Sequence, residues 1–298
     1  MPRGWGNWVC NMPHLPVLLR DIINLLVLKP GSRNIDCTFG DGGHSRAILQ
    51  SARDVQLLGI DTDAENISRA KKQKEFDHEK VILVNDNFRR LKAIALKNNF
   101  TEADAILMDL GWSSTQFAES GRGFSFLRDE PLDMRLGFGS LTAAEILNNW
   151  TEEEIGKILR EYGEERAWKK ITKAIVDKRR VQPITTTGQL VEIISALGER
   201  QGKIHPVTKT FQALRIAVND ELNALKEALP QAVEILKSGG RLAVISFHSL
   251  EDRIVKRFFQ SKNKSLKIIT KKPIIASRAE ILANPSSRSA KLRVAEKI

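Results

Sequence analysis

The chain has 298 residues, which is room for one large or two modest domains with a sizeable core. Apolar residues make up 42% of it and charged residues 28%, so the composition excludes a disordered tail protein. The two cysteines, Cys10 and Cys37, are too few for a secreted disulfide framework and lack the Cys-x-x-Cys spacing of a metal or redox site. Since the sequence has neither a long apolar run nor a signal peptide, we predict a cytoplasmic protein without a metal site.

The net charge of +11 is concentrated near the carboxyl end. Residues 253–298 hold thirteen Lys or Arg side chains against two acids, Glu280 and Glu296, so the rest of the chain is neutral overall. A polyanionic partner, such as nucleic acid or an anionic membrane surface, would explain this asymmetry. A solvated basic tail would explain it equally well, and the charge alone leaves both interpretations open.

The amino-terminal part of the chain alternates short apolar strands with helical segments. Residues 57–61 are an apolar run closed by an acid, which is typical of a strand buried on both faces of a parallel sheet. This alternation predicts a doubly wound α/β sheet. In chain order, we expect a helix over 14–28, a strand over 34–38, a helix over 45–52, a strand over 57–61, a helix over 64–74, a strand over 81–84, a helix over 88–98 and a strand over 105–109.

The alternation stops at about residue 116, where a glycine-containing loop region leads into three helical patterns over 142–148, 151–178 and 187–197. It resumes with a long helix over 210–236, broken near Pro230, and a strand over 241–245. Two extended stretches, 266–270 and 291–295, would finish the edge of the sheet. The sequence therefore predicts an α/β domain made of 1–115 and 211–298, with an all-helical domain, 116–210, inserted into it.

A glycine-containing turn after the first strand predicts a cofactor site. Glycines at 40, 42 and 43 would let the backbone approach a ligand closely, and Asp61 ends the second strand twenty-one residues after Gly40. An acid at that point accepts hydrogen bonds from the ribose hydroxyls of a nucleoside, which suits a dinucleotide or S-adenosylmethionine. The order of glycines differs from G-x-G-x-x-G, and Asp41 would repel a pyrophosphate, so the pattern favours S-adenosylmethionine.

Distinctive motifs occur along nearly the whole chain. They include His14-Leu15-Pro16-Val17-Leu18-Leu19, residues 36–45, Gly59-Ile60-Asp61, Asp109-Leu110-Gly111, Arg122-Gly123-Phe124-Ser125-Phe126, Pro131-Leu132-Asp133-Met134-Arg135, Phe211-Gln212-Ala213-Leu214-Arg215-Ile216 and residues 245–253. Several are six or more residues in an uncommon order, which makes chance matching remote. Together these motifs resemble those of the MraW-type family of ribosomal RNA small-subunit methyltransferases.

The resemblance implies a Rossmann-like fold and an S-adenosylmethionine-dependent enzyme that methylates the exocyclic N4 of a cytosine in the decoding region of small-subunit rRNA. Small-subunit rRNA or the small ribosomal subunit would be its partner, with the oligomeric state left open. A membrane is not expected, because the basic tail lacks a long amphipathic helix. Carried over residue by residue, the resemblance implies cofactor contacts at Gly42, Gly43, His44, Asp61, Phe88, Asp109 and Gln116, and assigns the inserted domain to RNA recognition.

The sequence does not identify the residue that would activate the cytosine amino group. Many amino-methyltransferases use a Pro-Pro-aromatic turn after the fourth strand, but here residues 109–114 contain no proline. Asp109 is our candidate catalytic residue, and it could instead serve the cofactor alone. For RNA contact we expect His248, Arg253, Lys256, Lys271 and Lys272. Two rival functions remain, a methyltransferase acting on another substrate and an RNA-binding protein with a relict pocket.

Overall fold

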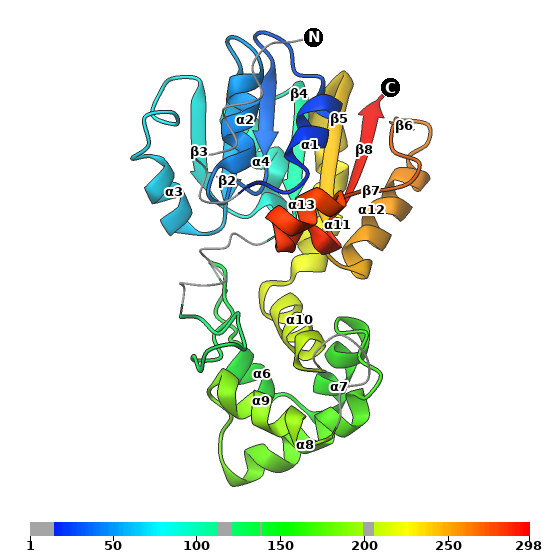
Figure 1. The fold of residues 1–298 in the computed structure, drawn as a ribbon. Helices are drawn as coiled ribbons and strands as arrows, with labels where there is room; N and C mark the ends of the chain where they lie inside the picture. The colour runs from blue at the N-terminus through cyan, green and yellow to red at the C-terminus, as the bar shows by residue number, and fades with distance from the viewer. Residues whose placement is uncertain (1–14, 112–120, 138, 199–205) are drawn as a thin grey trace. The chain divides into compact units, whose positions relative to one another are not determined.

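Five parallel strands form the centre of the protein in a computed structural model, which describes residues 15–111, 121–137, 139–198 and 206–298 (Figure 1). The strands run in the order β3-β2-β1-β4-β5-β8-β6, and β7 pairs with β8 outside this path. The first five are parallel, whereas β8 runs antiparallel to β5 and to β6. Their bounds are Arg33–Asp36 (β1), Gln56–Asp61 (β2), Val81–Asn85 (β3), Ala103–Asp109 (β4), Leu236–Ser246 (β5), Leu266–Ile268 (β6), Ile274–Ile275 (β7) and Lys291–Lys297 (β8).

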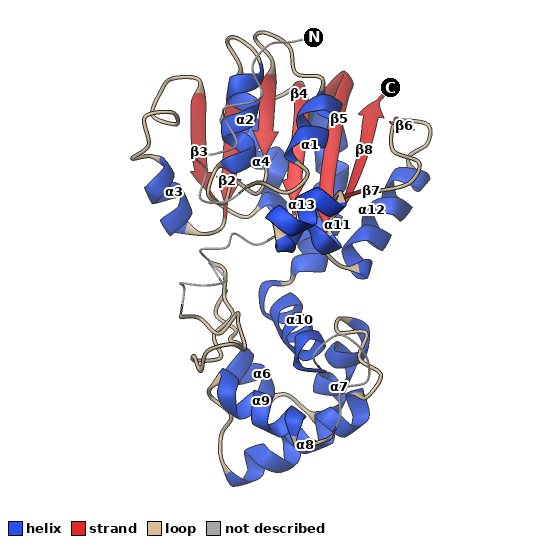
Figure 2. Cartoon of the chain, viewed as in Figure 1, coloured by secondary structure: helices blue, strands red, loops and turns tan. Residues whose placement is uncertain are grey.

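Helices flank the sheet (Figure 2). Their apolar residues form one core cluster on each face of it. One cluster joins the sheet to α4, α11 and α12, and the other joins it to α1, α2 and residues near α13. This arrangement confirms the predicted doubly wound α/β sheet. The helices of this part are Leu19–Leu26 (α1), Gly43–Ser51 (α2), Ala64–Ala70 (α3), Phe88–Arg90 (η2, a 3₁₀ turn), Leu91–Lys97 (α4), Glu221–Ile235 (α11), Ser249–Ser261 (α12), Arg278–Ala283 (α13) and Pro285–Ser289 (η3, a 3₁₀ turn).

The chain divides into two compact units, Met1–Trp112 with Asn223–Ile298, and Ser113–Leu222. The second unit is built from helices and loops, and α10 belongs to it because α10 packs against α6, α7 and α9. The second boundary therefore lies at Leu222 rather than at residue 210. The helices of this unit are Ala143–Asn149 (α6), Glu152–Glu161 (α7), Trp168–Val181 (α8), Thr187–Ser195 (α9) and Pro206–Asn219 (α10).

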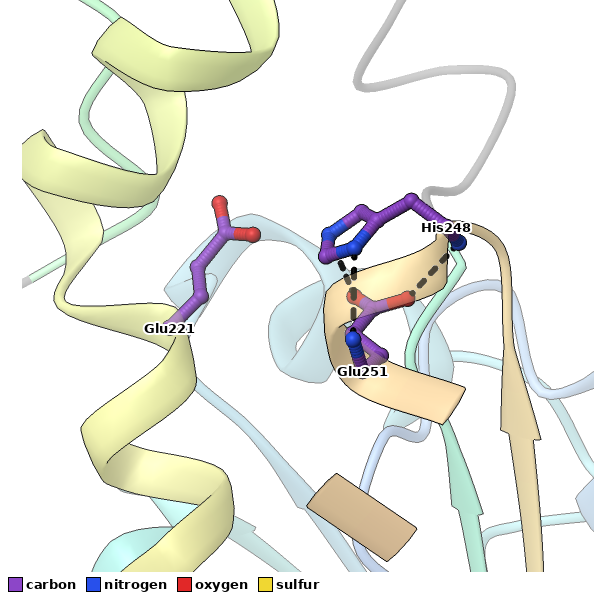
Figure 3. A group of neighbouring side chains, drawn as sticks. All are labelled: Glu221, His248 and Glu251. Atoms are coloured by element: carbon purple, nitrogen blue, oxygen red, sulfur yellow. Dashed lines mark hydrogen bonds and ion pairs between the residues drawn. The ribbon is translucent and has the colours of Figure 1, made fainter. Parts of the chain in front are cut away.

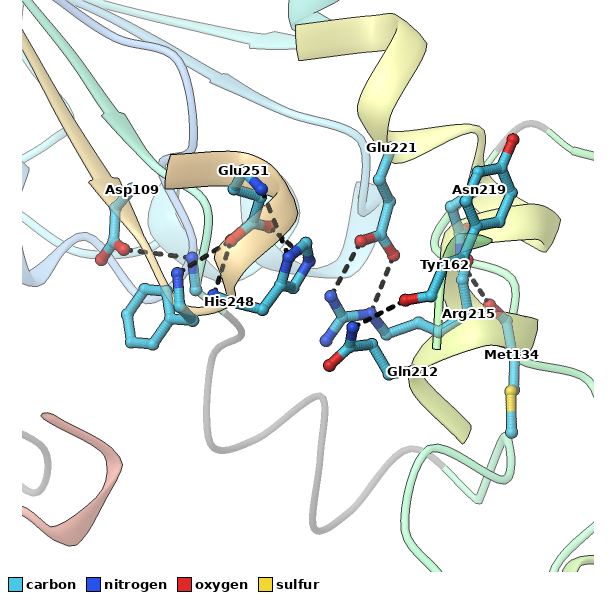
Figure 4. Close-up of polar contacts among 11 residues, drawn as sticks. Asp109, Met134, Tyr162, Gln212, Arg215, Asn219, Glu221, His248 and Glu251 are labelled. Atoms are coloured by element: carbon cyan, nitrogen blue, oxygen red, sulfur yellow. Dashed lines mark hydrogen bonds and ion pairs between the residues drawn. The ribbon is translucent and has the colours of Figure 1, made fainter. Parts of the chain in front are cut away.

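Side-chain hydrogen bonds from α10 hold loops of the helical unit (Figure 4). Asn219 Nδ2 donates to the carbonyl of Met134 at 2.8 Å, and Gln212 Nε2 donates to the carbonyl of Tyr162 at the same distance. The guanidinium of Arg215 pairs with both carboxylate oxygens of Glu221, at 2.9 and 2.8 Å. The bonds from Asn219 and Gln212 satisfy backbone carbonyls outside the helical hydrogen-bond pattern, and the Arg215–Glu221 pair links α10 to the start of α11.

Three sequence predictions need correction. The helix expected over 210–236 breaks at Asp220, whose φ of 50° interrupts the right-handed helix, whereas Pro230 lies inside α11. The helix expected over 151–178 is two helices, α7 and α8. The stretch 291–295 belongs to β8, which lies between β5 and β6 and is not an edge strand. Among the helices of the described ranges, none has the length and apolarity that a membrane span requires.

Candidate active site

The turn between β1 and α2 is shaped by packing of its glycines against other side chains. Gly42 has a φ of 74°, and a Cβ atom there would lie 2.6 Å from the ring of Phe76 and 2.8 Å from that of Phe39. A Cβ on Gly43 would lie 2.6 Å from Pro16. These two glycines are therefore required by aromatic and proline neighbours within the protein, and their contact with a cofactor stays a prediction.

Asp61 ends β2 as a buried carboxylate that organises this turn. Its Oδ2 accepts a hydrogen bond from Gly40 N at 2.6 Å and one from Asn66 Nδ2 at 3.3 Å, and its Oδ1 accepts from Asp63 N at 2.7 Å. The side chain is 8% exposed, and burial raises its pKa to about 6. A carboxylate has about four acceptor positions, so one remains for a ligand hydroxyl.

His44 and Asp109 form a pair between the start of α2 and the end of β4. His44 Nε2 lies 2.9 Å from the carbonyl of Val17, and its Nδ1 lies 3.4 Å from Asp109 Oδ2. Because a carbonyl only accepts, Nε2 must carry the proton, and Nδ1 faces the carboxylate. Burial raises the pKa of Asp109, and the charge of His44 acts in the opposite direction. Nδ1 of His44 therefore lies within ion-pair distance of the Asp109 carboxyl group.

A second buried acid supports this pair from β1. Ser45 Oγ donates to Asp36 Oδ2 at 2.7 Å, and Thr38 N donates to Asp36 Oδ1 at 3.1 Å. Thr38 Oγ1 in turn accepts from Asp109 N at 2.7 Å, and Gly111 N donates to Asp109 Oδ1 at 3.1 Å. Burial raises the pKa of Asp36. The ends of β1 and β4 are thus joined by a polar network around Asp109.

The charge of this region suits a cation that carries hydroxyl donors. Asp36, Asp61 and Asp109 gather three carboxyl groups at the carboxyl ends of β1, β2 and β4, where ligands bind in such sheets. Asp41, the acid that was expected to repel a pyrophosphate, is paired with Arg69 at 3.2 Å. The carboxyl groups of Asp36, Asp61 and Asp109 would repel a pyrophosphate instead. They suit S-adenosylmethionine, which combines a positive sulfur with a ribose.

Phe88 and Gln116 complete the set of predicted cofactor residues. Phe88 opens η2 after β3 and is half-buried against the core cluster that joins the sheet to α4, α11 and α12. Gln116 lies outside the described residues. Cys37 is buried in the core, and burial raises its pKa well above the ordinary value. The structure thus brings His44 and Asp109 into contact and places Asp61 at the end of β2, which β1 separates from β4.

His248 and Glu251 form the cap of α12 (Figure 3). His248 Nδ1 accepts from Glu251 N at 3.3 Å, while Glu251 Oε2 accepts from the backbone N of His248 and of Phe247. His248 Nε2 lies 3.1 Å from Glu251 Oε1 but outside hydrogen-bonding geometry. His248 therefore has a structural role in the helix cap, and its contact with RNA stays a prediction.

The remaining candidates for RNA contact lie on the surface. Arg253 and Lys256 are exposed on α12, and Lys271 and Lys272 are exposed between β6 and β7. Asp252 pairs with the buried Arg293 through bonds of 2.6 and 3.2 Å, so it ties α12 to β8.

Sequence reasoning missed the partners that hold the site together. The carbonyl of Val17 and the hydroxyl of Thr38 position His44 and Asp109, yet both contacts cross from one element to another. Only Thr38 could have been found from the sequence, because it lies two residues after the end of β1, at the edge of the sheet where ligands bind.

Comparison with known proteins identifies the family. A model described as the MraW methylase family matches residues 11–298. The ribosomal RNA small subunit methyltransferase H of Heliobacterium modesticaldum is 48% identical, with 96% of this chain and 98% of the relative covered. That of Symbiobacterium thermophilum is 46% identical, with 96% of each covered. Among solved structures, an rRNA methylase from Streptococcus thermophilus covers 96% of this chain and 99% of that chain at 10% identity and a TM-score of 0.46, which is too remote to carry an argument. The resemblance seen in the sequence is thereby confirmed, and the chain belongs to the MraW methylase family.

Proposed function

We propose that this protein transfers the methyl group of S-adenosylmethionine to the exocyclic N4 of a cytosine in the decoding region of small-subunit rRNA. The observation that carries the proposal is the family match over residues 11–298, joined by relatives that are named ribosomal RNA small subunit methyltransferase H. The base and the atom follow from the motif resemblance to that family. Small-subunit rRNA, alone or within the small ribosomal subunit, is then the partner, and the cytoplasm is the compartment.

The cofactor would be held at the carboxyl ends of β1, β2 and β4. When bound, S-adenosylmethionine supplies a methyl group on a positively charged sulfur. The remaining acceptor position of Asp61 would take a ribose hydroxyl, and the Phe88 ring would pack against the adenine. The full set proposed to contact the cofactor is Gly42, Gly43, His44, Asp61, Phe88, Asp109 and Gln116.

The residues of the chain must orient the amine and remove its proton. A cytosine amino group is a poor nucleophile, because its lone pair is delocalised into the ring. Transfer of the methyl group would leave the nitrogen positively charged, so the nitrogen must lose a proton. Asp109 is the proposed acceptor of that proton, and His44, whose Nδ1 lies 3.4 Å from Asp109 Oδ2, would position its carboxyl group.

Methylation at carbon 5 of a pyrimidine is the less favoured alternative. That reaction needs a cysteine nucleophile that adds to carbon 6 of the ring. Cys37 is buried, and its raised pKa keeps the thiol protonated and a poor nucleophile. The other cysteine, Cys10, lies outside the described residues. Transfer to an amine needs no covalent intermediate with the enzyme.

The nucleoside content of rRNA in cells lacking this protein tests the proposal. We expect N4-methylated cytidine to disappear from small-subunit rRNA and to return when the wild-type gene is restored. An unchanged nucleoside profile would contradict the proposed substrate. Loss of a different methylated nucleoside would support the rival methyltransferase instead.

A further inference from the structure

Helix α8 begins differently from three other helices of its unit. A capping box opens each of α6, α7 and α9, with Thr142, Thr151 and Thr186 as the cap residues. In contrast, α8 follows Ala167, whose side chain provides no cap, and its first turn contains no acid. Its first turn instead holds two exposed lysines, Lys169 and Lys170.

These lysines are placed where a helix disfavours positive charge. The amino-terminal end of a helix carries a partial positive charge, so a cation there is destabilising unless something offsets it. Lys169 lies 5.5 Å from the centre of the Trp168 ring, which is a weak offset. Within the described ranges, no ion pair is found for Lys170 or for Lys173 one turn later. Helix stability therefore does not explain these charges.

The basic residues at the other end of α8 have an ordinary explanation. Lys178, Arg179 and Arg180 lie in the last turn, where the helix dipole favours cations. Arg179 also donates to the carbonyl of Leu147 at 2.7 Å, which helps to end α6. The unexplained charge is thus confined to the first half of the helix and the turn before it.

The unexplained charges share one face of α8. The opposite face is buried through Ile171, Thr172, Ile175 and Val176. At about 100° per residue, Lys169, Lys170 and Lys173 fall within an arc of roughly 100°. We define the basic face of α8 as these three lysines together with the exposed Arg166 in the preceding turn.

Acidic residues are concentrated elsewhere in this unit. Residues 166–180 contain seven Lys or Arg side chains and one acid, Asp177. Helix α7 opens instead with the exposed residues Glu152, Glu153 and Glu154. Such segregation gives one helix of the unit a strongly positive surface.

We propose that the basic face of α8 binds phosphates of the RNA substrate. The inference rests on the proposed function and deepens it by naming the surface and the chemical group that it contacts. Lysine ammonium groups neutralise phosphates and release condensed counterions, a gain that would offset their unfavourable place in the helix. This face offers ammonium and guanidinium groups, so it orients the RNA backbone and leaves base recognition to other residues.

Binding of unmethylated small-subunit rRNA over a range of salt concentrations tests the proposal. In a variant carrying Lys169→Ala, Lys170→Ala and Lys173→Ala, the slope of log K against log salt should flatten by about 2 units. Affinity near 0.1 M salt should fall roughly ten- to a hundredfold. As the matched control, Lys71→Ala, Lys72→Ala and Lys74→Ala remove the same charge from exposed positions of the α/β unit and should leave both quantities near the wild-type values.

A second variant separates RNA binding from folding. Lys170→Glu with Lys173→Glu places acids near the start of α8, so the thermal midpoint should rise by roughly 1–4 °C while RNA affinity falls at least as far as in the triple variant. Unchanged RNA affinity in both α8 variants, or an equal loss in the control, would overturn the proposal. If wild-type protein methylates rRNA in that case, the proposed function stands and only this inference fails. If wild-type protein neither binds nor methylates rRNA, both fail.

Discussion

At the residue scale, the site depends on carboxyl groups that are ionised with difficulty. Asp36, Asp61 and Asp109 all have raised pKa values, with burial as the main cause. Hydrogen bonds from backbone amides and the charge of His44 act in the opposite direction. This balance predicts that both cofactor binding and proton transfer depend on pH.

Cofactor affinity should fall as the pH decreases through about 6. The pKa of Asp61 is raised to about 6, and the protonated acid is a weaker acceptor for a ribose hydroxyl. A hydrogen bond to a charged group contributes about 1.5–3 kcal/mol, so the dissociation constant should rise roughly ten- to a hundredfold. Isothermal titration with S-adenosylmethionine between pH 5 and 8 measures this change. Asp61→Asn should bind weakly with no such step at pH 6.

Unfolding caused by the protonation of Asp61 cannot account for this loss of cofactor affinity at low pH. The folded-state pKa of Asp61 lies above its unfolded value of about 3.9. The contribution of this group to stability is therefore fully present below pH 4 and is lost as the pH rises through 6. A wild-type dissociation constant that stays level from pH 5 to 8 would remove Asp61 from the cofactor contacts.

His44 should act on the reaction through Asp109, as a positioning residue. In His44→Gln, loss of the imidazole removes an effect that lowers the pKa of Asp109, so the acidic limb of the kcat profile should move to higher pH. Asp109→Asn removes the proton acceptor itself and should lower kcat by about 10²–10⁴ at every pH, with little change in thermal stability. Identical pH profiles for wild type and His44→Gln would show that the pair has no role in proton transfer.

At the element scale, the turn between β1 and α2 depends on aromatic packing. Phe39 and Phe76 meet edge to face, with ring centres 5.0 Å apart, and both lie against Gly42. A side chain at residue 42 would push these rings apart and move the start of α2, which carries His44.

Gly42→Ala should destabilise the protein more than Gly31→Ala does. Both glycines have a φ of 74°, so both substitutions introduce the same backbone strain. A Cβ at Gly31 meets nothing within 4 Å, whereas one at Gly42 lies 2.6 Å from Phe76. Overpacking adds about 1–3 kcal/mol, which denaturant unfolding resolves. Equal losses of unfolding free energy in the two variants would disprove the packing explanation.

The sequence predicted the elements whose pattern is local and missed features that depend on distant contacts. The strands β2 and β4 were predicted because each is an apolar run closed by an acid, Asp61 or Asp109. The break at Asp220 was missed, because an aspartate in the left-handed region leaves little trace in the apolar periodicity. The place of β8 inside the sheet depends on pairing with β5 and β6, which no local pattern records.

At the scale of the whole molecule, the excess of positive charge is divided among surfaces. Residues 253–298 account for the net charge of +11, and Lys271 and Lys272 are exposed among them. Part of the positive charge in this region is used inside the protein, because Arg293 is buried against Asp252. The number of cations in the sequence therefore overstates the number that can meet a phosphate.

Lys271→Ala combined with Lys272→Ala should weaken RNA binding through its salt dependence. If both lysines neutralise phosphates, their removal flattens the slope of log K against log salt by about 1–2 units. Affinity for S-adenosylmethionine should be unchanged and serves as the control for folding. A slope equal to that of wild type would assign these lysines to the solvated surface.

The central claim is that the chain methylates an exocyclic cytosine amine in rRNA. The most direct measurement incubates purified protein with S-adenosylmethionine and unmethylated small-subunit rRNA, then identifies the modified nucleoside by mass spectrometry. We predict N4-methylcytidine from the wild type and from a Cys10→Ser, Cys37→Ser variant, and almost none from Asp109→Asn. The formation of 5-methylcytidine, together with an inactive but folded cysteine variant, would contradict the account.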